Sequence, residues 1–464
     1  METVEDLVKK ARDAQQKVKN YTQSQIDEVC LSVAWQMYND ENVDRLSRMA
    51  VEETKYGNYE SKVIKHKRKI GGVIQDVMGA VSVGLIEKNE DTGISKYAKP
   101  VGVVCAILPA TNPTATAGSN VVAVLKGRNA VIFRPSSRAA NCSKLAIEFM
   151  RAGLRKVGAP EDLVQCAEDM DITATNLLMQ KCDVIVATGG APMVRAAYSS
   201  GTPSYGVGAG NAVAVVAEDA PVAQAASMVT SSKIFDNATS CSSENSLLIH
   251  ISVYQSMLQA LKDNGGHLCS PEERTKLQNT LWKANAKGKI SINPDIVAQN
   301  AKTIAGMAEI NVHENTVMLL VEGTLPADLD IFSQEKLSPV LTLYPYEDFE
   351  KALEMYSRIA RRCGYGHSVG IHTFKDEYIR RMGEILETSR VTVRQPMAAA
   401  NGGHALNRMP STTTLGCGTW GRNSTTENIN YKHFLNITWV NEPVSARDFS
   451  EEKLWGEFWK KYGK

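Results

Sequence analysis

The stretch VGVVCAILPATNP, residues 101–113, decides the fold. It opens with an apolar run rich in valine, which predicts a buried strand over 101–108 that ends at Pro109. Residues 114–125 are mostly small and apolar and predict a helix, and residues 130–133 predict a second strand. A strand, a helix and a second strand in this order are typical of a parallel sheet, which binds ligands at the carboxyl ends of its strands.

The same alternation continues along the chain. A helix over 139–157 ends at the stop signal Gly158-Ala159-Pro160, and Pro192 falls in the first turn of a helix that follows Gly189-Gly190. The other predicted elements are strands at 163–166, 183–188, 212–216 and 246–250 and helices at 221–233 and 253–262. We expect an α/β protein with a doubly wound, parallel-sheet cofactor domain over 1–214 and an α/β catalytic domain over 215–410.

The segments outside this alternation predict a helical start and a β flap. Apolar residues recur three and four apart near the N-terminus, so residues 1–75 are expected to be helical. A polar, turn-rich segment near 87–99 predicts a projecting hairpin, and residues 411–464 predict a return segment, a strand at 434–440 and a charged tail. Chains could exchange β pairing at the hairpin and the late strand, which favours a homodimer or homotetramer.

Composition excludes several classes of protein. The chain has 464 residues, 43% of them hydrophobic, with 52 basic and 51 acidic residues. Such a balance argues against a nucleic-acid-binding protein, and the apolar runs are too short for a membrane span. Residues 1–20 are charged and unlike a signal peptide, so we expect a cytoplasmic protein. Nine scattered cysteines and eight histidines without close pairing predict reduced thiols and no metal site.

Cys241 is the first candidate for chemistry. It lies in DNATSCSSE, residues 236–244, where small and polar residues predict a partly exposed loop before a strand. A reactive thiol needs such a setting, although an ordinary loop cysteine fits the same pattern. Cys417 is a rival nucleophile, but it stands between two glycines and we interpret it as a packing residue.

Asn112 and two glycine-rich stretches are further candidates. Asn112 lies between prolines where a strand ends, so its amide could donate to an oxyanion or could cap the turn. Thr188, Gly189 and Gly190 follow a strand and precede a helix, which lets a cofactor approach the backbone. A second stretch over 205–211 contains Gly208, and each glycine signal is weak alone.

Together, in order and spacing, these motifs resemble the aldehyde dehydrogenase superfamily over nearly the whole chain. The resemblance implies that Cys241 is the nucleophile, that Asn112 donates to the oxyanion, and that Glu335 of EKLSPV (residues 335–340) holds the nicotinamide ribose. It also implies a cofactor site formed by Arg134, Pro135, Ser137, Arg138, Thr188, Gly189, Gly190, Gly208, Glu335 and Pro339.

One departure from the hydrolytic members concerns the acyl acceptor. Those members carry a glutamate that activates water, and Gly206 stands at the matching position here. Without that base a thiol should take the acyl group, as in the CoA-acylating branch. Gly366-His367-Ser368 and TLGCGTWG (residues 414–421) also resemble motifs of that branch. His367 is a candidate for proton transfer near the thiols, or it has a structural role. A hydrolytic enzyme and a non-catalytic scaffold are the alternatives.

Basic residues indicate the cofactor and the substrate. Ser137 with Arg134 and Arg138 nearby favours NADP over NAD, unless Arg138 is a solvated charge or contacts CoA. Arg394, His404 and Arg408 favour an anionic aldehyde, which the resemblance narrows to sulfoacetaldehyde or succinate semialdehyde. We favour sulfoacetaldehyde, because three cationic or donor groups suit an ionised sulfonate with three oxygens. Acetaldehyde and propionaldehyde remain alternatives, as do surface arginines without a substrate role.

Overall fold

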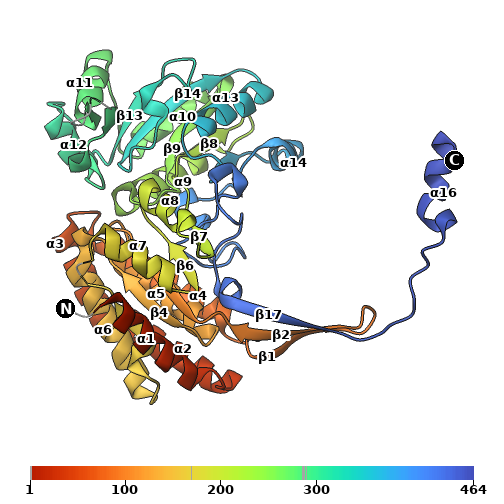
Figure 1. Ribbon diagram of the computed structural model, residues 1–464. Coiled ribbons are helices and arrows are strands. Elements are labelled where there is room, and N and C mark those ends of the chain that lie inside the picture. Colours follow the sequence, from red (N-terminus) through yellow and green to blue (C-terminus); the bar gives the residue numbers. More distant parts are fainter. Residues whose placement is uncertain (1–2, 169, 285–287, 289) are drawn as a thin grey trace.

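A five-stranded parallel sheet forms from the stretch that opens the alternation (Figure 1). The computed structural model describes residues 3–168, 170–284, 288 and 290–464. The strand order is β5-β4-β3-β6-β7, and the central strand β3 is buried over its whole length. The strands are β3 (Val103–Ile107), β4 (Ala130–Arg134), β5 (Val164–Cys166), β6 (Val184–Ala187) and β7 (Ser204–Gly206).

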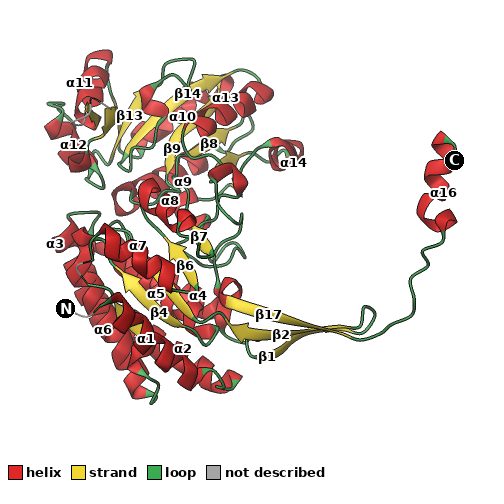
Figure 2. Cartoon of the chain, viewed as in Figure 1, coloured by secondary structure: helices red, strands yellow, loops and turns green. Residues whose placement is uncertain are grey.

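Helices cover both faces of this sheet, which explains why its strands read as continuous apolar runs. Figure 2 shows the helices packed around these strands. The helices α5 (Pro113–Lys126) and α6 (Ala140–Lys156) lie against one face, and α2 (Gln23–Tyr38) packs on both of them. The helix α1 (Val4–Val18) lies against the other face, beside α7 (Ile172–Lys181).

A second sheet has seven parallel strands in the order β10-β13-β14-β9-β8-β15-β16. Its strand β8 alternates between two cores, since Ala212, Ala214 and Val216 pack on one side and Val213 and Val215 on the other. The strands are β8 (Ala212–Val216), β9 (Glu244–His250), β10 (Gly266–Leu268), β13 (Met318–Glu322), β14 (Val340–Tyr346), β15 (Val369–His372) and β16 (Val391–Val393).

The predicted domain boundary at 214 falls inside the strand β8, which pairs with β9 and β15 of the second sheet. The edge of the first sheet is instead closed by β7, a strand too short to recognise from its pattern. Residues 207–211 then carry the chain from one sheet to the other.

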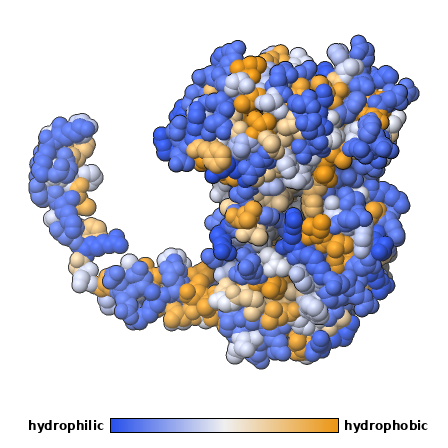
Figure 3. All heavy atoms as spheres, turned by 180° about the vertical axis from the view of Figure 1, so that it is seen from behind, coloured by the Kyte–Doolittle hydropathy of each residue, from blue (hydrophilic) through white to orange (hydrophobic). Residues whose placement is uncertain are grey.

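The predicted hairpin and late strand join in a three-stranded antiparallel arm (Figure 1). The strand order is β1-β2-β17, with β1 (Gly84–Asn89), β2 (Ile94–Pro100) and β17 (Leu435–Asn441). The arm projects from the body, and an extended segment beyond it ends in α16 (Glu451–Tyr462), far from the rest of the chain. Apolar residues gather at the base of the arm (Figure 3).

The other elements complete the two lobes. They are α3 (Asp40–Thr54), α4 (Tyr59–Val77), α8 (Ala191–Ser199), α9 (Val222–Ile234), α10 (Ile251–Asp263), α11 (Pro271–Leu281), β11 (Trp282–Ala284), β12 (Ile290–Ile292), α12 (Ala301–Met307), α13 (Phe349–Arg362), α14 (Asp376–Ile385) and α15 (Met397–Ala400). Within the described ranges, no helix combines the length and the apolar character that a membrane crossing requires.

Candidate functional site

A cavity of about 1140 Å³ lies at the carboxyl edge of the first sheet. The residues that follow β3 and β6 form one wall, and the loops that lead into β8 and β9 form the opposite wall. The helix α4 and the segment 402–415 close the remaining sides. This volume is large enough for a cofactor together with a substrate.

The loop that carries Cys241 begins with three consecutive residues in the left-handed backbone region. The φ angles are 52° for Asp236, 53° for Asn237 and 59° for Ala238. Residues other than glycine enter this region at a cost of about 1–2 kcal/mol each, so surrounding contacts must hold the turn. The Asp236 carboxylate supplies one of them by accepting a hydrogen bond from the backbone N–H of Asn58 at 3.1 Å.

Gly210 packs directly against the nucleophile. A Cβ at this position would lie 2.3 Å from the carbonyl oxygen of Cys241 and 2.5 Å from its Cβ. Both distances are shorter than a real contact allows, so only glycine fits there. The glycine-rich stretch read from the sequence therefore has a packing role beside the thiol.

His367 lies next to the Cys241 thiol. Its Nε2 is 3.1 Å from Cys241 Sγ, and its Nδ1 is 2.9 Å from Ser368 Oγ. Burial lowers the pKa of His367 to about 3, with a further contribution from the positive charge of Arg390. Burial also raises the pKa of Cys241 to about 12, and the negative charge of Glu335 adds to this. The resting pair is therefore a thiol and a neutral imidazole.

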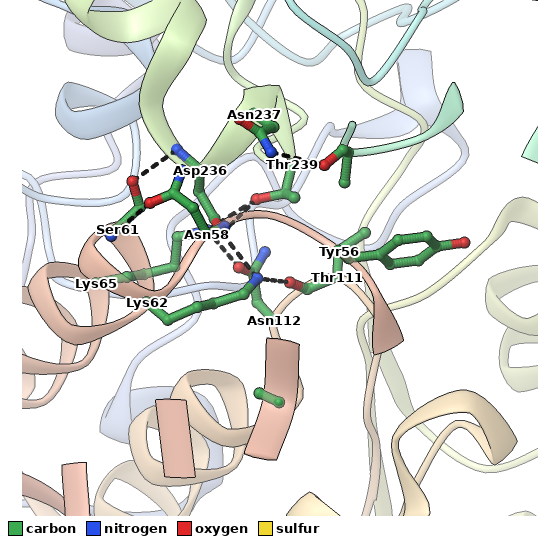
Figure 4. Close-up of polar contacts among 12 residues, drawn as sticks. Tyr56, Asn58, Ser61, Lys62, Lys65, Thr111, Asn112, Asp236, Asn237 and Thr239 are labelled. Atoms are coloured by element: carbon green, nitrogen blue, oxygen red, sulfur yellow. Dashed lines mark hydrogen bonds and ion pairs between the residues drawn. The ribbon is translucent and has the colours of Figure 1, made fainter. Parts of the chain in front are cut away.

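Asn112 is the N-cap residue of α5, but its side chain does not cap the helix. Its Oδ1 instead accepts a hydrogen bond from Lys65 Nζ of α4. Lys65 also donates to Asp236 Oδ2, and Lys62 Nζ donates to the same oxygen at 2.8 Å (Figure 4). Sequence reasoning missed this cluster because lysines on an amphipathic helix usually mark its solvent face.

Cys417 is fully buried, and its Sγ lies 3.5 Å from the carbonyl oxygen of Leu415. A Cβ at Gly208 would lie 3.1 Å from this Sγ, so the second cysteine packs beneath the glycine-rich loop. This placement agrees with the packing role that we expected for Cys417.

Only some of the residues predicted to hold a nicotinamide cofactor line the cavity. Those that line the cavity are Arg134, Ser137, Thr188, Gly189, Gly190, Gly208 and Glu335. No cavity contact is shown for Pro135, Arg138 or Pro339. The guanidinium of Arg134 donates to the carbonyl oxygens of Pro135 and Met170, and Arg138 donates to Tyr56 Oη at 3.0 Å.

The N-terminus of α8 fits a pyrophosphate. Its N-cap residue, Gly190, makes no side-chain capping bond, and the helix starts at the cavity wall. A Cβ at Gly189 or Gly190 would have no neighbour closer than 3.8 Å, so the space above this turn is open. Pro192 has no N–H and the Met193 N–H donates to the carbonyl oxygen of Gly190 at 3.0 Å, so the positive end of the helix dipole is what would attract a phosphate oxygen here.

Likewise, only some of the residues predicted to bind an anionic substrate line the cavity. His404 and Arg408 line the cavity, as expected. Arg394 is not brought there, because its guanidinium donates to the carbonyl oxygen of Thr373 and packs on the Phe374 ring at 4.5 Å. Four cations of α4 that the sequence did not single out line the cavity instead, namely Lys65, Lys67, Arg68 and Lys69.

Comparison with known proteins decides the family. Residues 1–405 match the model of the aldehyde dehydrogenase family. The chain belongs to the aldehyde dehydrogenase family. It is 60% identical to the acylating sulfoacetaldehyde dehydrogenase of Bilophila wadsworthia strain 3_1_6, over the full length of both chains. The resemblance inferred from the motifs is confirmed.

Solved structures of this family have the same fold. An acetylating aldehyde dehydrogenase from Geobacillus thermoglucosidasius superposes with a TM-score of 0.91 at 35% identity and covers 96% of this chain and 97% of its own. A propionaldehyde dehydrogenase from Rhodopseudomonas palustris, solved with bound CoA and an acylated cysteine, gives 0.85 at 28% identity, over 95% and 97% of the two chains. The predicted α/β fold is confirmed.

At Gly206, where we expect the base of the hydrolytic members to be missing, the structure leaves no room for a side chain. An added Cβ would lie 2.7 Å from both Val194 and the Tyr198 ring. Tyr198 Oη also accepts a hydrogen bond from the Gly206 N–H at 2.8 Å. A side chain at this position would have to displace the tyrosine.

A possible group of metal ligands lies outside this cavity. Within the described part of the chain, ligand atoms of His267, Cys269 and Glu273 lie within 4.8 Å of one another. The Glu273 carboxylate is already used, because it accepts from the Ser270 N–H at 2.9 Å in the capping box of α11. The expected absence of a metal remains a prediction.

Proposed function

We propose that this chain is a CoA-acylating aldehyde dehydrogenase that oxidises sulfoacetaldehyde to its acyl-CoA with NADP or NAD. The observation that carries the proposal is the 3.1 Å contact between Sγ of Cys241, which lines the cavity, and Nε2 of His367, which is buried behind it. The relative from Bilophila wadsworthia, which is named for this activity, supports the choice of substrate.

The first step is attack of Cys241 on the aldehyde carbon. The S–C bond forms as the carbonyl π electrons move to oxygen, and the thiol proton passes to His367 Nε2. Because the thiol pKa is about 12 and the imidazole pKa about 3, this transfer proceeds only together with attack and not before it. The Asn112 amide and the Cys241 backbone N–H donate to the new alkoxide.

The second step oxidises the thiohemiacetal to a thioester on Cys241. The nicotinamide ring, when bound, accepts the hydride. This chain contributes the uncapped turn at Gly190 for the pyrophosphate and Glu335 for the nicotinamide ribose. Burial raises the pKa of Glu335 to about 8, so this carboxyl is in part protonated and can donate as well as accept a hydrogen bond.

The third step transfers the acyl group to the CoA thiol. The sulfur of CoA attacks the thioester carbon, the oxyanion site again holds the tetrahedral oxygen, and Cys241 leaves. Before this step His367 releases the proton of the first half-reaction to solvent, which is the one proton that the overall oxidation produces. The neutral imidazole then accepts the proton of the CoA thiol and returns it to Cys241 as that sulfur leaves. One thioester replaces another, so the reaction is reversible.

The cations of α4 support an anionic substrate. Lys69 Nζ donates to the carbonyl oxygen of Gly402 at 2.6 Å, and no carboxylate among the described residues forms an ion pair with it. Burial lowers the pKa of Lys69 to about 8, the charge of Lys65 lowers it further, and Cys241 acts in the opposite direction. The sulfonate of the substrate would pair with the Lys69 ammonium, and Arg68 and Arg408 would donate further hydrogen bonds to it.

We propose NADP as the preferred cofactor. Ser137 lines the cavity at a position where an acidic residue would repel a 2′-phosphate. Arg138 follows it, and its guanidinium would have to turn from Tyr56 Oη to pair with that phosphate. One observation favours NAD. The Glu53 carboxylate accepts hydrogen bonds from the backbone N–H groups of Asn141 and Cys142 in the first turn of α6, where its negative charge would repel a 2′-phosphate. Initial rates at equal concentrations of the two cofactors distinguish these assignments.

A hydrolytic enzyme is the second candidate. Glu335 lines the cavity, and its raised pKa of about 8 suits a general base better than that of an ordinary carboxylate. The blocked position at Gly206 argues against hydrolysis, because the base of the hydrolytic members is absent there.

Mass spectrometry of the covalent intermediate tests the proposal. Protein incubated with sulfoacetaldehyde and NADP, without CoA, should carry a sulfoacetyl group on the peptide that contains Cys241. Addition of CoA should remove this group and release sulfoacetyl-CoA. Acylation of another cysteine, or release of the free acid at the same rate without CoA, would refute the proposal.

A further inference from the structure

A buried polar cluster lies behind the oxyanion site and joins three separate parts of the chain (Figure 4). Lys62 and Lys65 come from α4, Asn112 from the start of α5, and Asp236 from the turn before the nucleophile. Asp236 is fully buried, and the two lysines are 3% and 6% exposed. Burying three charged groups is costly unless each one has partners.

Lys65 Nζ makes three contacts in this cluster. It donates to Asn112 Oδ1, to Asp236 Oδ2 and, at 2.9 Å, to Thr239 Oγ1. An ammonium group has three hydrogens and no acceptor, so all of its donors are used. Thr239 Oγ1 in turn donates to Asp236 Oδ2 at 2.7 Å, which ties the lysine to the nucleophile loop.

The contact with Asn112 determines how the amide faces. An amide has an oxygen that accepts and an NH₂ group that donates, and the two are nearly identical in shape. Because Lys65 can only donate, the oxygen must face the lysine and the NH₂ group must face away from it. Asn112 lines the cavity, so its NH₂ group is left for the substrate oxygen.

We propose that Lys65 is a positioning residue that holds the Asn112 amide in the donor orientation that the oxyanion requires. Asp236 holds the lysine in turn, and it also starts the left-handed turn that leads to Cys241. One carboxylate therefore sets both the amide donor and the nucleophile loop. This inference rests on the proposed function, because it takes Asn112 as the oxyanion donor.

The charges in the cluster are consistent with this role. Burial acts to raise the pKa of Asp236, but the ammonium groups of Lys65 and Lys62 outweigh it and keep that pKa below its usual value. The carboxylate therefore stays ionised, and a fixed negative charge keeps the lysine in place. A Cβ at Gly57 would lie 1.8 Å from Asp236 Oδ1, so a glycine leaves room for this carboxylate.

Lys62 offers a matched control for Lys65. It lies one turn earlier on the same helix, is equally buried and donates to the same oxygen of Asp236 at 2.8 Å. Its other contact is with the carbonyl oxygen of Thr111 at 2.6 Å, and it makes no hydrogen bond with the Asn112 side chain. Replacing either lysine removes one partner of Asp236, but only the loss of Lys65 releases the amide.

The experiment measures CoA-dependent cofactor reduction for Lys65→Met, Lys62→Met, Asn112→Ala and the double variant of Lys65 and Asn112. Loss of one oxyanion donor lowers kcat by about 10²–10³, so Asn112→Ala should fall in that range. Lys65→Met should lose about 10- to 100-fold in kcat with KM for the aldehyde changed less than about threefold. Lys62→Met should lose less than about threefold in kcat, although its unfolding midpoint should change by about as much as that of Lys65→Met.

The double variant distinguishes positioning from a general structural role. If Lys65 acts through Asn112, the variant lacking both should be no slower than Asn112→Ala alone. Equal fold losses from Lys65→Met in the two backgrounds, or equal losses from the two lysine variants, would overturn the inference. If Asn112→Ala itself keeps full activity, the oxyanion assignment in the proposed function fails instead.

Discussion

Cys241 and His367 are 3.1 Å apart, and burial keeps both of them neutral. A nucleophilic cysteine usually has a lowered pKa, held down by a neighbouring cation or a helix N-terminus. Here the cations near the thiol belong to Lys65, Lys69 and Arg390, and they do not outweigh its burial. The Cys241 thiol should therefore stay protonated in the unliganded protein.

Alkylation of the unliganded protein tests the state of the thiol. The reactive form is the thiolate, and a raised pKa of about 12 means that its fraction grows about tenfold for each pH unit below that value. The rate at which iodoacetamide modifies Cys241 should therefore keep rising from pH 7 to pH 9. Peptide mass spectrometry measures this rate, with Cys241→Ser as the control, and a plateau below pH 8 would contradict the assignment.

Lys69 should determine the preference for an anionic aldehyde. A charge-assisted hydrogen bond contributes about 1.5–3 kcal/mol, so Lys69→Met should raise KM for sulfoacetaldehyde about 10- to 100-fold. The KM for propionaldehyde, a neutral aldehyde, should change less than about threefold. Steady-state kinetics with both aldehydes provides the measurement.

Lys67 is the control for this substitution. It also lies on α4 and lines the cavity, but its Nζ is paired with Asp40 Oδ1 at 2.6 Å. Lys67→Met should leave the ratio of the two KM values unchanged. If Lys69→Met and Lys67→Met change that ratio equally, the cavity has only a general attraction for anions and Lys69 has no specific role.

At the scale of residues, the sequence indicated those whose chemistry is unusual for their local setting. Cys241 in a polar loop and Asn112 between prolines are examples, and His367 was singled out by its resemblance to family motifs. Lys65 and Lys69 could not be found in this way, because their roles depend on partners far along the chain. Arg394 has the charge that an anionic substrate requires, but its guanidinium packs on the Phe374 ring and not in the cavity.

At the scale of elements, Arg390 joins the loops around His367. It is 5% exposed and donates to Asn428 Oδ1 and to the carbonyl oxygens of His367, Gly416 and Thr426. The backbone N–H of His367 also donates to the carbonyl oxygen of Gly364 at 3.1 Å. Arg390 is therefore one of the contacts that hold His367 in position.

Arg390→Met should lower the free energy of unfolding by about 3 kcal/mol, because several buried acceptors lose their donor. Urea unfolding followed by circular dichroism measures this change, and kcat should fall in the same variant as His367 loses its support. Arg381→Met is the control, since its ion pair with Glu350 is exposed and worth less than about 1 kcal/mol. Equal losses in the two variants would contradict the role of Arg390.

The elements that the sequence predicted are those with a long or regular pattern. The strand at 103–107 and the helix at 140–156 lie close to their predicted ranges. The strands β7, β10 and β16 have three residues each, too few to show a hydrophobic period. The equally short β5 was predicted at 163–166, just after the stop signal Gly158-Ala159-Pro160.

At the scale of the whole molecule, the arm leaves a sheet edge open in the single chain. The strand β17 pairs with β2 on one side only, and Ile437, Trp439 and Val440 are 37%, 58% and 42% exposed. An apolar edge strand of this kind is a site where a second chain can add a strand. The arm thus supports the predicted homodimer or homotetramer.

Lysines on this edge should prevent assembly. The double variant Ile437→Lys and Val440→Lys places charges on the open strand, so its mass in solution should fall to that of one chain. Light scattering after size-exclusion chromatography gives the mass. Ile172→Lys, at an exposed apolar residue on α7 away from the arm, should keep the wild-type mass. An unchanged mass in the double variant would place the interface elsewhere.

The central claim is that Cys241 passes its acyl group to CoA, and one measurement tests it most directly. Absorbance at about 340 nm reports reduction of the nicotinamide when purified protein is mixed with sulfoacetaldehyde and NADP, with and without CoA. We predict steady reduction only with CoA, and at most a single turnover per active site without it. Steady reduction at the same rate without CoA would mean that water accepts the acyl group, which would contradict the account.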